Sequence, residues 1–269
     1  MNTVGGKRIL LTGATGGIGY PLAKLLAAKG ARLALVDRNS ERLREVCDEI
    51  GRESINITLD LGLPQAAETA VAKTCAAFGG MDILINNAGI MDFTLFHQQN
   101  PARIAQIMNI NAVTPMLLTR AALPHMLAQG AGRIVNIGST FGSIGFPHYA
   151  VYSASKFAAR GFSEALRREL EDSGVEVTYV APRAIKTPLN DAASVRMMEA
   201  NKIAMDDPAE IAQIIVRAIE HGRKDVYIGG SEPIFARLNG ILPRLVDFGL
   251  KQKTRAAHRF ADRGAFNEV

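Results

Sequence analysis

A tyrosine and a lysine stand four residues apart at Tyr152 and Lys156, and Ser139 precedes the tyrosine by 13 positions. On a helix, residues four apart share a face, so the ammonium can lie below the phenol and stabilise its phenolate. A free phenol has a pKa of about 10 and needs such help to act at neutral pH. The spacing predicts an acid/base pair, although the same spacing also occurs in exposed amphipathic pairs.

A glycine-rich turn lies between the first apolar stretch and a predicted helix over 18–29. Glycine there lets the backbone approach a pyrophosphate at the helix N-terminus, where a Cβ would obstruct it. Glycines also fill tight corners for structural reasons, so the turn alone is weak evidence for dinucleotide binding. The residues expected to meet the cofactor are Gly13, Thr15, Gly16, Gly17, Ile18 and Gly19.

Asp37 ends the second predicted strand, 24 residues after Gly13. A carboxylate there accepts hydrogen bonds from the adenosine ribose and repels a 2′-phosphate. Arg38 could pair with such a phosphate, but the glycine turn holds no basic residue to assist it. NAD is therefore the favoured cofactor, with NADP as the alternative.

Short β-branched stretches alternate with longer helical periods, which is typical of βαβ units around a parallel sheet. Right-handed crossovers make a doubly wound sheet the expected packing. We predict an α/β fold with a single Rossmann domain over 1–230, whose seven-stranded, mainly parallel sheet carries helices on both faces. The strands are expected at 8–11, 32–36, 55–59, 83–86, 133–137, 176–180 and 225–228.

From about residue 5 to 230 the chain resembles the short-chain dehydrogenase/reductase family. The resemblance rests on the glycine turn, the Tyr152/Lys156 pair and further motifs that follow in the same order and at similar separations. Those motifs are Asp60, Asn86-Asn87-Ala88-Gly89, Asn111, Ser139 and the segment from Pro182 to Thr187. The family implies an enzyme that moves hydride between a nicotinamide cofactor and a carbonyl or alcohol.

The resemblance also implies a role for each matching position. Tyr152 is the expected general acid/base, Ser139 the donor to the reacting oxygen, and Lys156 the group that holds the nicotinamide ribose. Asn111 is expected to position a water near the lysine, with Asn109 as the alternative. Besides Tyr152 and Lys156, the remaining cofactor contacts are expected from Asp60, Leu61, Asn87, Ala88, Gly89, Pro182, Ile185 and Thr187.

Several of these positions also have structural explanations. Ser139 could cap a turn, Asp60 could be a helix N-cap, and Asn86 could tie neighbouring strands together. Arg183 departs from the family, which usually has glycine after the proline at 182. It could bind an anionic group of the substrate or cofactor, or it could form a surface salt bridge.

The expected substrate edges are mostly apolar. A methionine-bearing stretch over 188–206 could close as a lid over a lipophilic or acyl-like substrate, although helix packing would also explain its methionines. His148 is expected to be a surface or supporting residue rather than a catalytic one. The apolar edge residues are Met91, Phe93, Phe141, Phe146, Met197, Met198 and Met205.

The C-terminal extension over 231–269 predicts a basic amphipathic helix that bends at Pro243. The segment 237–263 contains seven basic and two acidic residues, and this excess accounts for the whole net charge of +5. The helix could be a lid or a membrane-surface segment within 232–263, or it could pack on the parent domain or a second subunit. Its apolar stripe is Ile234, Leu238, Ile241, Leu245 and Phe248.

Other features exclude several classes of protein. The basic residues accompany no nucleic-acid reading motif, so nucleic acid is not an expected partner. Cys47 and Cys75 lack metal-ligand spacing, so we expect no metal and a reducing compartment. No apolar segment is long enough to span a membrane and no signal peptide is recognised, which predicts a cytoplasmic protein. The family resemblance implies a homodimer or homotetramer.

We therefore predict an NAD(P)-dependent oxidoreductase that interconverts an alcohol and a ketone or aldehyde, with Tyr152 as the general acid/base. An epimerase or dehydratase on the same fold is one alternative. A non-catalytic dinucleotide-binding regulatory protein is another. The presence of Asn111, Ser139, Tyr152 and Lys156 together argues against the regulatory protein.

Overall fold

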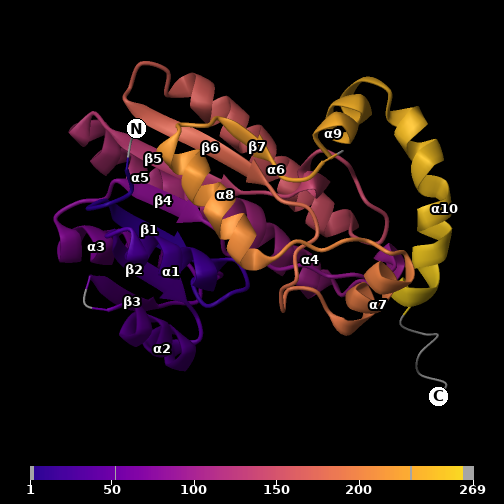
Figure 1. Cartoon of the computed structure of the whole chain (residues 1–269), viewed down its shortest axis with the longest axis horizontal. Helices are drawn as coiled ribbons and strands as arrows, with labels where there is room; N and C mark the ends of the chain where they lie inside the picture. Colours follow the sequence, from indigo (N-terminus) through magenta and orange to yellow (C-terminus); the bar gives the residue numbers. More distant parts are fainter. Residues whose placement is uncertain (1–2, 52, 231, 263–269) are drawn as a thin grey trace.

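Seven parallel strands form one sheet in the order β3-β2-β1-β4-β5-β6-β7 (Figure 1). The structure is a computed structural model that describes residues 3–51, 53–230 and 232–262. The predicted seven-stranded sheet is confirmed, and all pairings among the described strands are parallel. The strands are β1 Arg8–Thr12, β2 Arg32–Asp37, β3 Ser54–Thr58, β4 Ile83–Asn86, β5 Gly132–Ile137, β6 Val175–Ala181 and β7 Asp225–Tyr227.

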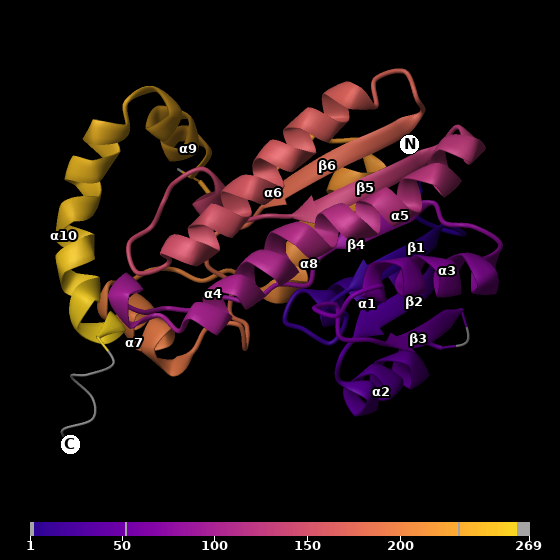
Figure 2. The same ribbon diagram turned by 180° about the vertical axis from the view of Figure 1, so that it is seen from behind.

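Helices cover both faces of this sheet (Figures 1 and 2). Strands in such a sheet are apolar on both sides: Ile9 and Leu11 enter one core, and Leu10 enters the other. One face carries α1 Gly19–Ala28, α2 Ser40–Ile50 and α8 Pro208–Glu220. The other carries α3 Ala66–Phe78, α5 Thr114–Gln129 and α6 Ala150–Glu169.

Polar side chains fix the carboxyl ends of the central strands. The Thr12 hydroxyl at the end of β1 accepts hydrogen bonds from the amides of Asn87 and Ala88, at 3.0 and 3.1 Å, beyond β4. The strand order reverses between β1 and β4, where doubly wound sheets bind ligands. The loops that carry the candidate residues therefore meet at this edge.

A buried amide chain ties β4 and β5 to α6. Asn86 donates through Nδ2 to Oδ1 of Asn136 at 2.8 Å, and Asn136 donates to Oγ of Ser163 at 2.8 Å. Buried polar groups need such partners, because an unpaired one is costly. The strand-tying explanation of Asn86 is thus confirmed, and α6, which carries Tyr152, is held in register with the sheet.

A wider π-helical turn joins α4 Pro101–Met108 to α5 over Asn109–Val113. Such turns displace the following helix and occur often at functional sites. Asn111 lies in this turn and is buried. The sequence predicts a helix here but does not distinguish its π-helical turn from ordinary α-helix.

The C-terminal extension differs from the single bent helix predicted. It forms two helices, α9 Glu232–Ile241 and α10 Pro243–Ala261, with a break at Leu242. Proline lacks the amide that a continuous helix needs, so Pro243 opens a new helix instead of bending one. α10 contacts α7 Ala192–Ala200.

Residues 1–2, 52, 231 and 263–269 lie outside the described part, and with them the outer limits of the two predicted regions, 1–230 and 231–269. Arg263 of the predicted basic tail is among these residues. Within the described ranges, no helix combines the length and hydropathy that crossing a membrane requires.

Candidate active site

Tyr152, Ser139 and Lys156 meet between the end of β5 and the first turns of α6. All three side chains are buried. The Ser139 side chain is near enough to the Tyr152 hydroxyl to lower its pKa, and the Lys156 ammonium lies 5.6 Å from the centre of the Tyr152 ring. The helix therefore brings the tyrosine and lysine together as their spacing predicts, and the strand end adds the serine.

Burial dominates the ionisation of this pair. It raises the pKa of Tyr152 to about 12, against the smaller lowering effect of the Ser139 side chain. It lowers the pKa of Lys156 to about 8. The pKa of Tyr152 is thus shifted in the direction opposite to the stabilised phenolate expected from the sequence, because removal from water disfavours the charged phenolate. In this form the tyrosine is a proton donor at neutral pH.

Asn111 and Lys156 flank the same backbone position, Gly89. A Cβ built there would lie 3.4 Å from Asn111 Oδ1 and 3.7 Å from Lys156 Nζ. Lys156 donates to the carbonyl of Ile137 at 2.9 Å, which gives its buried cation a partner. The structure thus brings Asn111 and the lysine together across the segment that follows β4.

The Asn111 side chain is engaged with the protein itself. Its Oδ1 accepts from the Ile90 amide at 2.8 Å, and its Nδ2 donates to the Ile90 carbonyl at 2.8 Å and to Ser155 Oγ at 3.0 Å. These contacts hold the Gly89-Ile90 segment against α6. The alternative, Asn109, instead donates to the Gly62 carbonyl at 3.0 Å, on the loop after β3.

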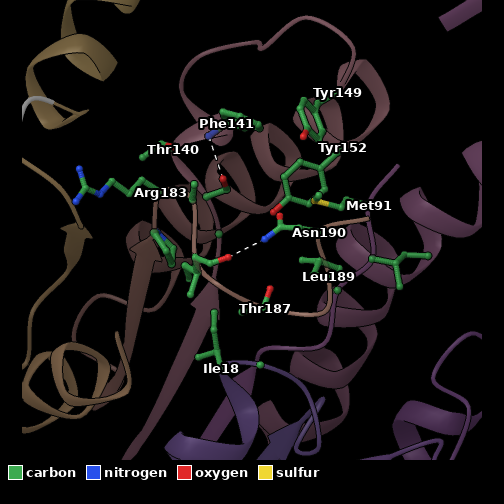
Figure 3. Close-up of a pocket in the computed structure, with 18 of the residues that line it drawn as sticks. Ile18, Met91, Thr140, Phe141, Tyr149, Tyr152, Arg183, Thr187, Leu189 and Asn190 are labelled. Carbon is green, nitrogen blue, oxygen red and sulfur yellow. Dashed lines mark hydrogen bonds between the residues drawn. The ribbon is translucent and has the colours of Figure 1, made fainter. Parts of the chain in front are cut away.

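Ser139 also serves as a turn cap. Its Oγ accepts from the Phe141 amide at 3.1 Å, where the chain leaves β5 (Figure 3). The structural explanation of Ser139 is therefore confirmed. It is compatible with a hydrogen bond to a ligand, because a hydroxyl can accept from the turn and still donate its own proton.

The glycine turn is tightly packed inside the protein. A Cβ on Gly19 would lie 1.9 Å from the Gly13 carbonyl oxygen, and one on Gly17 would lie 2.3 Å from Thr187 Cγ2. Gly13 has φ +66°, a conformation that L side chains rarely adopt. Internal packing therefore accounts for these glycines in addition to any ligand. No described side chain caps the N-terminus of α1, so its first amides suit an anion.

The glycine turn, Ser139 and Tyr152 line one cavity of about 1180 Å³. Gly19, Asn111 and Lys156 lie beside the cavity and are not among its described lining residues. One cavity therefore reaches from the N-terminal end of α1 to Tyr152. The predicted residues that line it are Gly13, Thr15, Gly16, Gly17, Ile18, Asp37, Arg38, Asp60, Leu61, Asn87, Ala88, Gly89, Ser139, Tyr152, Pro182, Ile185 and Thr187.

Two carboxylates stand at the adenosine end of this cavity. Asp37 accepts from the Thr15 amide at 3.1 Å and from the Arg38 amide at 2.8 Å, which fixes its position. Asp60 accepts from the Gly62 amide at 2.8 Å. The helix N-cap explanation of Asp60 is wrong, because α3 begins only at Ala66; the aspartate stabilises a tight turn instead.

Arg183 forms the salt bridge that one of its two explanations predicted. Its Nε donates to both carboxylate oxygens of Asp206 at 3.0 Å, and its Nη2 donates to Oδ1 at 2.7 Å. Figure 3 shows the guanidinium extending away from Tyr152. The pair fastens the chain after β6 to the residue that ends the 188–206 stretch, where Ile185 and Asp206 also form a parallel bridge.

The substrate end of the cavity is apolar. Phe141 stacks on Phe146 with ring centres 4.9 Å apart, and Met197 and Met198 are buried in the same cluster. Figure 3 shows Met91 and Tyr149 beside Tyr152, and all three belong to the same apolar cluster. Met197 and Met198 thus pack α7 against this cluster, as the helix-packing explanation predicts, and they also line the cavity; closure of the 188–206 stretch as a lid stays a prediction.

Several residues that line the cavity were not predicted from the sequence. Tyr149 is three positions before Tyr152 and donates to Ser194 Oγ at 3.0 Å. Its spacing of three residues from Tyr152 places it on the same face of a helix, and that spacing could have predicted its position in the cavity. Other such lining residues come from the 188–206 stretch and from the two C-terminal helices. The apolar stripe of those helices could not be assigned to the cavity from the sequence. These residues are Leu189, Asn190, Phe235, Leu238, Leu245, Val246, Gly249 and Leu250.

His148 lies against the C-terminal helix. Its ring is 5.4 Å from that of His258 on α10 and 5.8 Å from that of Phe93. Burial lowers its pKa, and the nearby His258 lowers it further. The supporting role expected of His148 agrees with these contacts. The described residues contain no cluster that could hold a metal ion.

Similar proteins of known sequence include dehydrogenases and reductases. An uncharacterized oxidoreductase of Bacillus subtilis, YxnA, is 34% identical over 248 residues, which cover 89% of this chain and 70% of the relative. Dehydrogenase/reductase SDR family member 7B of Bos taurus is 33% identical over 85% of this chain and 75% of its own. A Nostoc protein named ketoacyl reductase HetN is 33% identical over 90% and 85%.

Solved structures share the fold. A short-chain dehydrogenase/reductase from Burkholderia phymatum in complex with NAD superposes with a TM-score of 0.84 at 24% identity, covering 91% of this chain and 97% of its own. A metagenomic short-chain oxidoreductase in complex with NADP gives a TM-score of 0.71 at 31% identity, covering 84% and 98%. The cofactor therefore differs between structures of this fold.

A family model described as short chain dehydrogenase matches residues 7–197, more than half of the chain. The relatives above exceed 30% identity over most of the chain. The protein therefore belongs to the short-chain dehydrogenase/reductase family of NAD(P)-dependent oxidoreductases.

Proposed function

We propose that this oxidoreductase interconverts a secondary alcohol and a ketone, or reduces an aldehyde, on an apolar or acyl-like substrate. The observation that carries the proposal is that Tyr152 and Ser139 line one cavity together with the glycine turn and a set of apolar side chains, while the buried Lys156 ammonium lies beside the Tyr152 ring. A carbonyl beside Tyr152 and Ser139 would lie within reach of two hydroxyl donors.

In the reducing direction, bound NAD(P)H would supply the hydride that adds to the carbonyl carbon. Tyr152 gives its hydroxyl proton to the oxygen as the carbon–oxygen double bond becomes single. Ser139 donates a hydrogen bond to the same oxygen and stabilises its developing negative charge. Lys156, with its lowered pKa, stands close enough to the phenol to favour loss of the Tyr152 proton. Asn111 keeps the Gly89-Ile90 wall in place.

NAD is the cofactor that the adenosine end of the cavity favours. The Asp37 carboxylate is fixed by three backbone amides and lines the cavity where the ribose hydroxyls would lie. A 2′-phosphate there would meet this negative charge. Arg38 is the basic residue beside it, which leaves NADP as the alternative.

The apolar arm of the cavity supports a lipophilic substrate. Its walls combine aromatic, methionine and leucine side chains from three separate segments. Arg183, the cation beside it, is already paired with Asp206. The name of one relative, ketoacyl reductase, agrees with an acyl-like substrate.

We also propose a cytoplasmic homo-oligomer. Val113, Leu117 and Phe157 are exposed apolar residues near Asn111 in sequence or on α6 after Tyr152. Burial of such residues between copies would explain their exposure in one chain. The cysteines at 47 and 75 are free thiols, which suits a reducing compartment.

Replacement of Tyr152 tests the function directly. With NADH and a panel of long-chain ketones and aldehydes, Tyr152→Phe should lower kcat by about 10²–10⁴-fold, because the proton donor is lost. NADH affinity, measured by fluorescence titration, should change by less than about threefold, since the phenyl ring remains. NADPH should give a lower kcat/KM than NADH in the wild type.

Tyr149→Phe is the matched control, because this buried tyrosine also lines the cavity but its hydroxyl bonds Ser194. It should keep turnover within about tenfold of wild type. Full turnover in Tyr152→Phe, or an equal loss in both variants, would contradict the proposed role of Tyr152.

The buried lysine should also weaken the fold at neutral pH. Lys156→Met removes a buried charge, which stabilises the fold, but it leaves the Ile137 carbonyl without its donor, which offsets part of that gain. The free energy of unfolding should therefore rise by about 1–2 kcal/mol at pH 7. The pKa of this lysine falls from 10.5 in the unfolded chain to about 8 in the folded protein. Urea unfolding measured from pH 7 to 10.5 gives the comparison.

The pH dependence follows from which state holds the proton. Below about pH 8 the lysine is charged in both states, so the wild type bears the full cost of burial. Between pH 8 and 10.5 the folded protein loses the proton first, so wild-type stability rises relative to the variant and the difference shrinks. Lys73→Met, at an exposed position of α3, is the control and should show neither effect. A less stable Lys156→Met at pH 7 would contradict this account.

Gly249 on α10 offers a test of the apolar arm. It lines the cavity, and a Cβ built there meets no atom within 4 Å. Gly249→Phe should therefore fill space without strain and lower kcat/KM at least about tenfold for a twelve-carbon ketone but not for a four-carbon one. Gly240→Phe is the control, because that glycine on α9 also has open space but is not among the lining residues. Equal effects on both ketones would contradict a chain-binding arm.

A further inference from the structure

The two C-terminal helices expose an unusual concentration of large apolar side chains. Monomeric proteins rarely leave a contiguous apolar patch of this kind without a partner. One explanation for the apolar stripe was packing on the parent domain. That explanation is wrong for four of the five stripe residues, because their side chains are exposed. The exposed set, here named the apolar crest, is Ile234 at 68%, Phe235 at 48%, Ile241 at 76%, Leu242 at 52%, Leu245 at 55% and Phe248 at 79% exposure.

The crest stands on a hairpin, formed by α9 and α10, that is held to the domain near its turn and at its C-terminal end. Figures 1 and 2 show α9 and α10 as an arm at the edge of the molecule, away from the sheet. Asn239 on α9 donates to the Ser143 carbonyl at 2.9 Å. At the end of α10, the Ala261 carbonyl accepts from the Leu95 amide at 3.3 Å. The hairpin is thus held in place while the crest remains outside.

Cations share the faces of the helices that carry the crest. On α10, Arg244, Phe248, Lys251 and Arg255 recur at positions i, i+4, i+7 and i+11, so they form one stripe, and all four are exposed. On α9, exposed Arg237 lies between Ile234 and Ile241 on a common face. Against these cations the same stretch presents one exposed carboxylate, that of Asp247, among its described side chains.

This charge distinguishes between two occupants of the crest. In an isologous dimer, the same surface of a second copy would bring its arginines and lysine toward these ones, and like charges oppose such contact. An anionic lipid surface instead attracts the cations and accepts the apolar side chains between its headgroups. The pattern of large apolar residues flanked by cations is that of helices that lie in a membrane interface.

The crest is continuous with the apolar arm of the cavity. Phe235 and Leu245 belong to both, because each is exposed and also lines the cavity. Leu238, Val246 and Leu250 continue from these two residues along the inner side of the hairpin. A lipophilic molecule at the crest would therefore meet an unbroken apolar path toward Tyr152.

We propose that the α9–α10 hairpin docks the enzyme on an anionic lipid surface and that apolar substrates enter the cavity from that surface. The docking rests on the crest and its cations alone. The entry of substrate rests in addition on the proposed function.

Co-sedimentation with vesicles tests the docking. The full chain should pellet with phosphatidylcholine vesicles that contain about 30% phosphatidylserine, and should be released by high salt because exposed charges are screened. Binding to pure phosphatidylcholine should be at least about tenfold weaker. The double variant Ile241→Ser and Phe248→Ser should lose at least about tenfold in partitioning.

The double variant Leu63→Ser and Leu127→Ser is the matched control, since it removes two exposed apolar residues outside the hairpin. It should bind vesicles as the wild type does. Urea unfolding should give similar midpoints for both double variants, which shows that they are folded. Absence of wild-type binding, or equal binding by the crest variant, would overturn the proposal.

Two further measurements separate the competing explanations. If sedimentation velocity shows that the crest variant dissociates an oligomer while the wild type ignores vesicles, the crest is an interface between copies and the docking proposal is wrong. Tyr152→Phe should bind vesicles as the wild type does, because docking needs no turnover. A failure of the proposed chemistry would leave that binding intact, and a failure of docking would leave turnover of dispersed substrates intact.

Discussion

The burial of the Lys156 cation beside Tyr152 is the constraint on which the candidate site depends. Removal from water costs the charged form of the lysine and the ionised form of the tyrosine alike, and it shifts their pKa values in opposite directions. The result is a protonated phenol next to an ammonium that loses its proton more readily than usual. Such a pair is costly to the fold and useful to a reaction that moves one proton.

The surrounding structure keeps this pair in place. The carbonyl of Ile137 gives the buried ammonium a partner, and the Asn86–Asn136–Ser163 chain fixes the helix that carries both residues against two strands. The π-helical turn brings Asn111 to the Gly89-Ile90 segment on the other side of the lysine. Each contact spans elements far apart in the sequence, so the geometry of the site is a property of the whole parallel sheet.

Local patterns allowed most of the fold to be predicted. The five central strands are short apolar stretches that are largely buried, and each of the seven predicted strands lies within two residues of its observed limits because no long-range information is needed to find it. The helical spacing of Tyr152 and Lys156 likewise predicted their proximity. Pro243 marked the discontinuity in the extension, but local pattern did not separate a bend from two helices.

The remainder depended on tertiary packing. The direction of the Tyr152 pKa shift could not be predicted from spacing, because it follows from the depth of burial. The apolar stripe of the extension did not identify the surface it meets, and part of it lines the cavity while most of it faces outward. Arg183 could be assigned to a salt bridge only once the fold brought Asp206 beside it.

Hydride transfer to a carbonyl held near Tyr152 is the central claim, and isotopic labelling tests it most directly. The wild-type enzyme would be incubated with NADH deuterated at both C4 positions and a long-chain ketone, and the product analysed by mass spectrometry. The account predicts an alcohol with one deuterium on the former carbonyl carbon. Cofactor binding without deuterium in any product, across ketones and aldehydes of graded chain length, would contradict it.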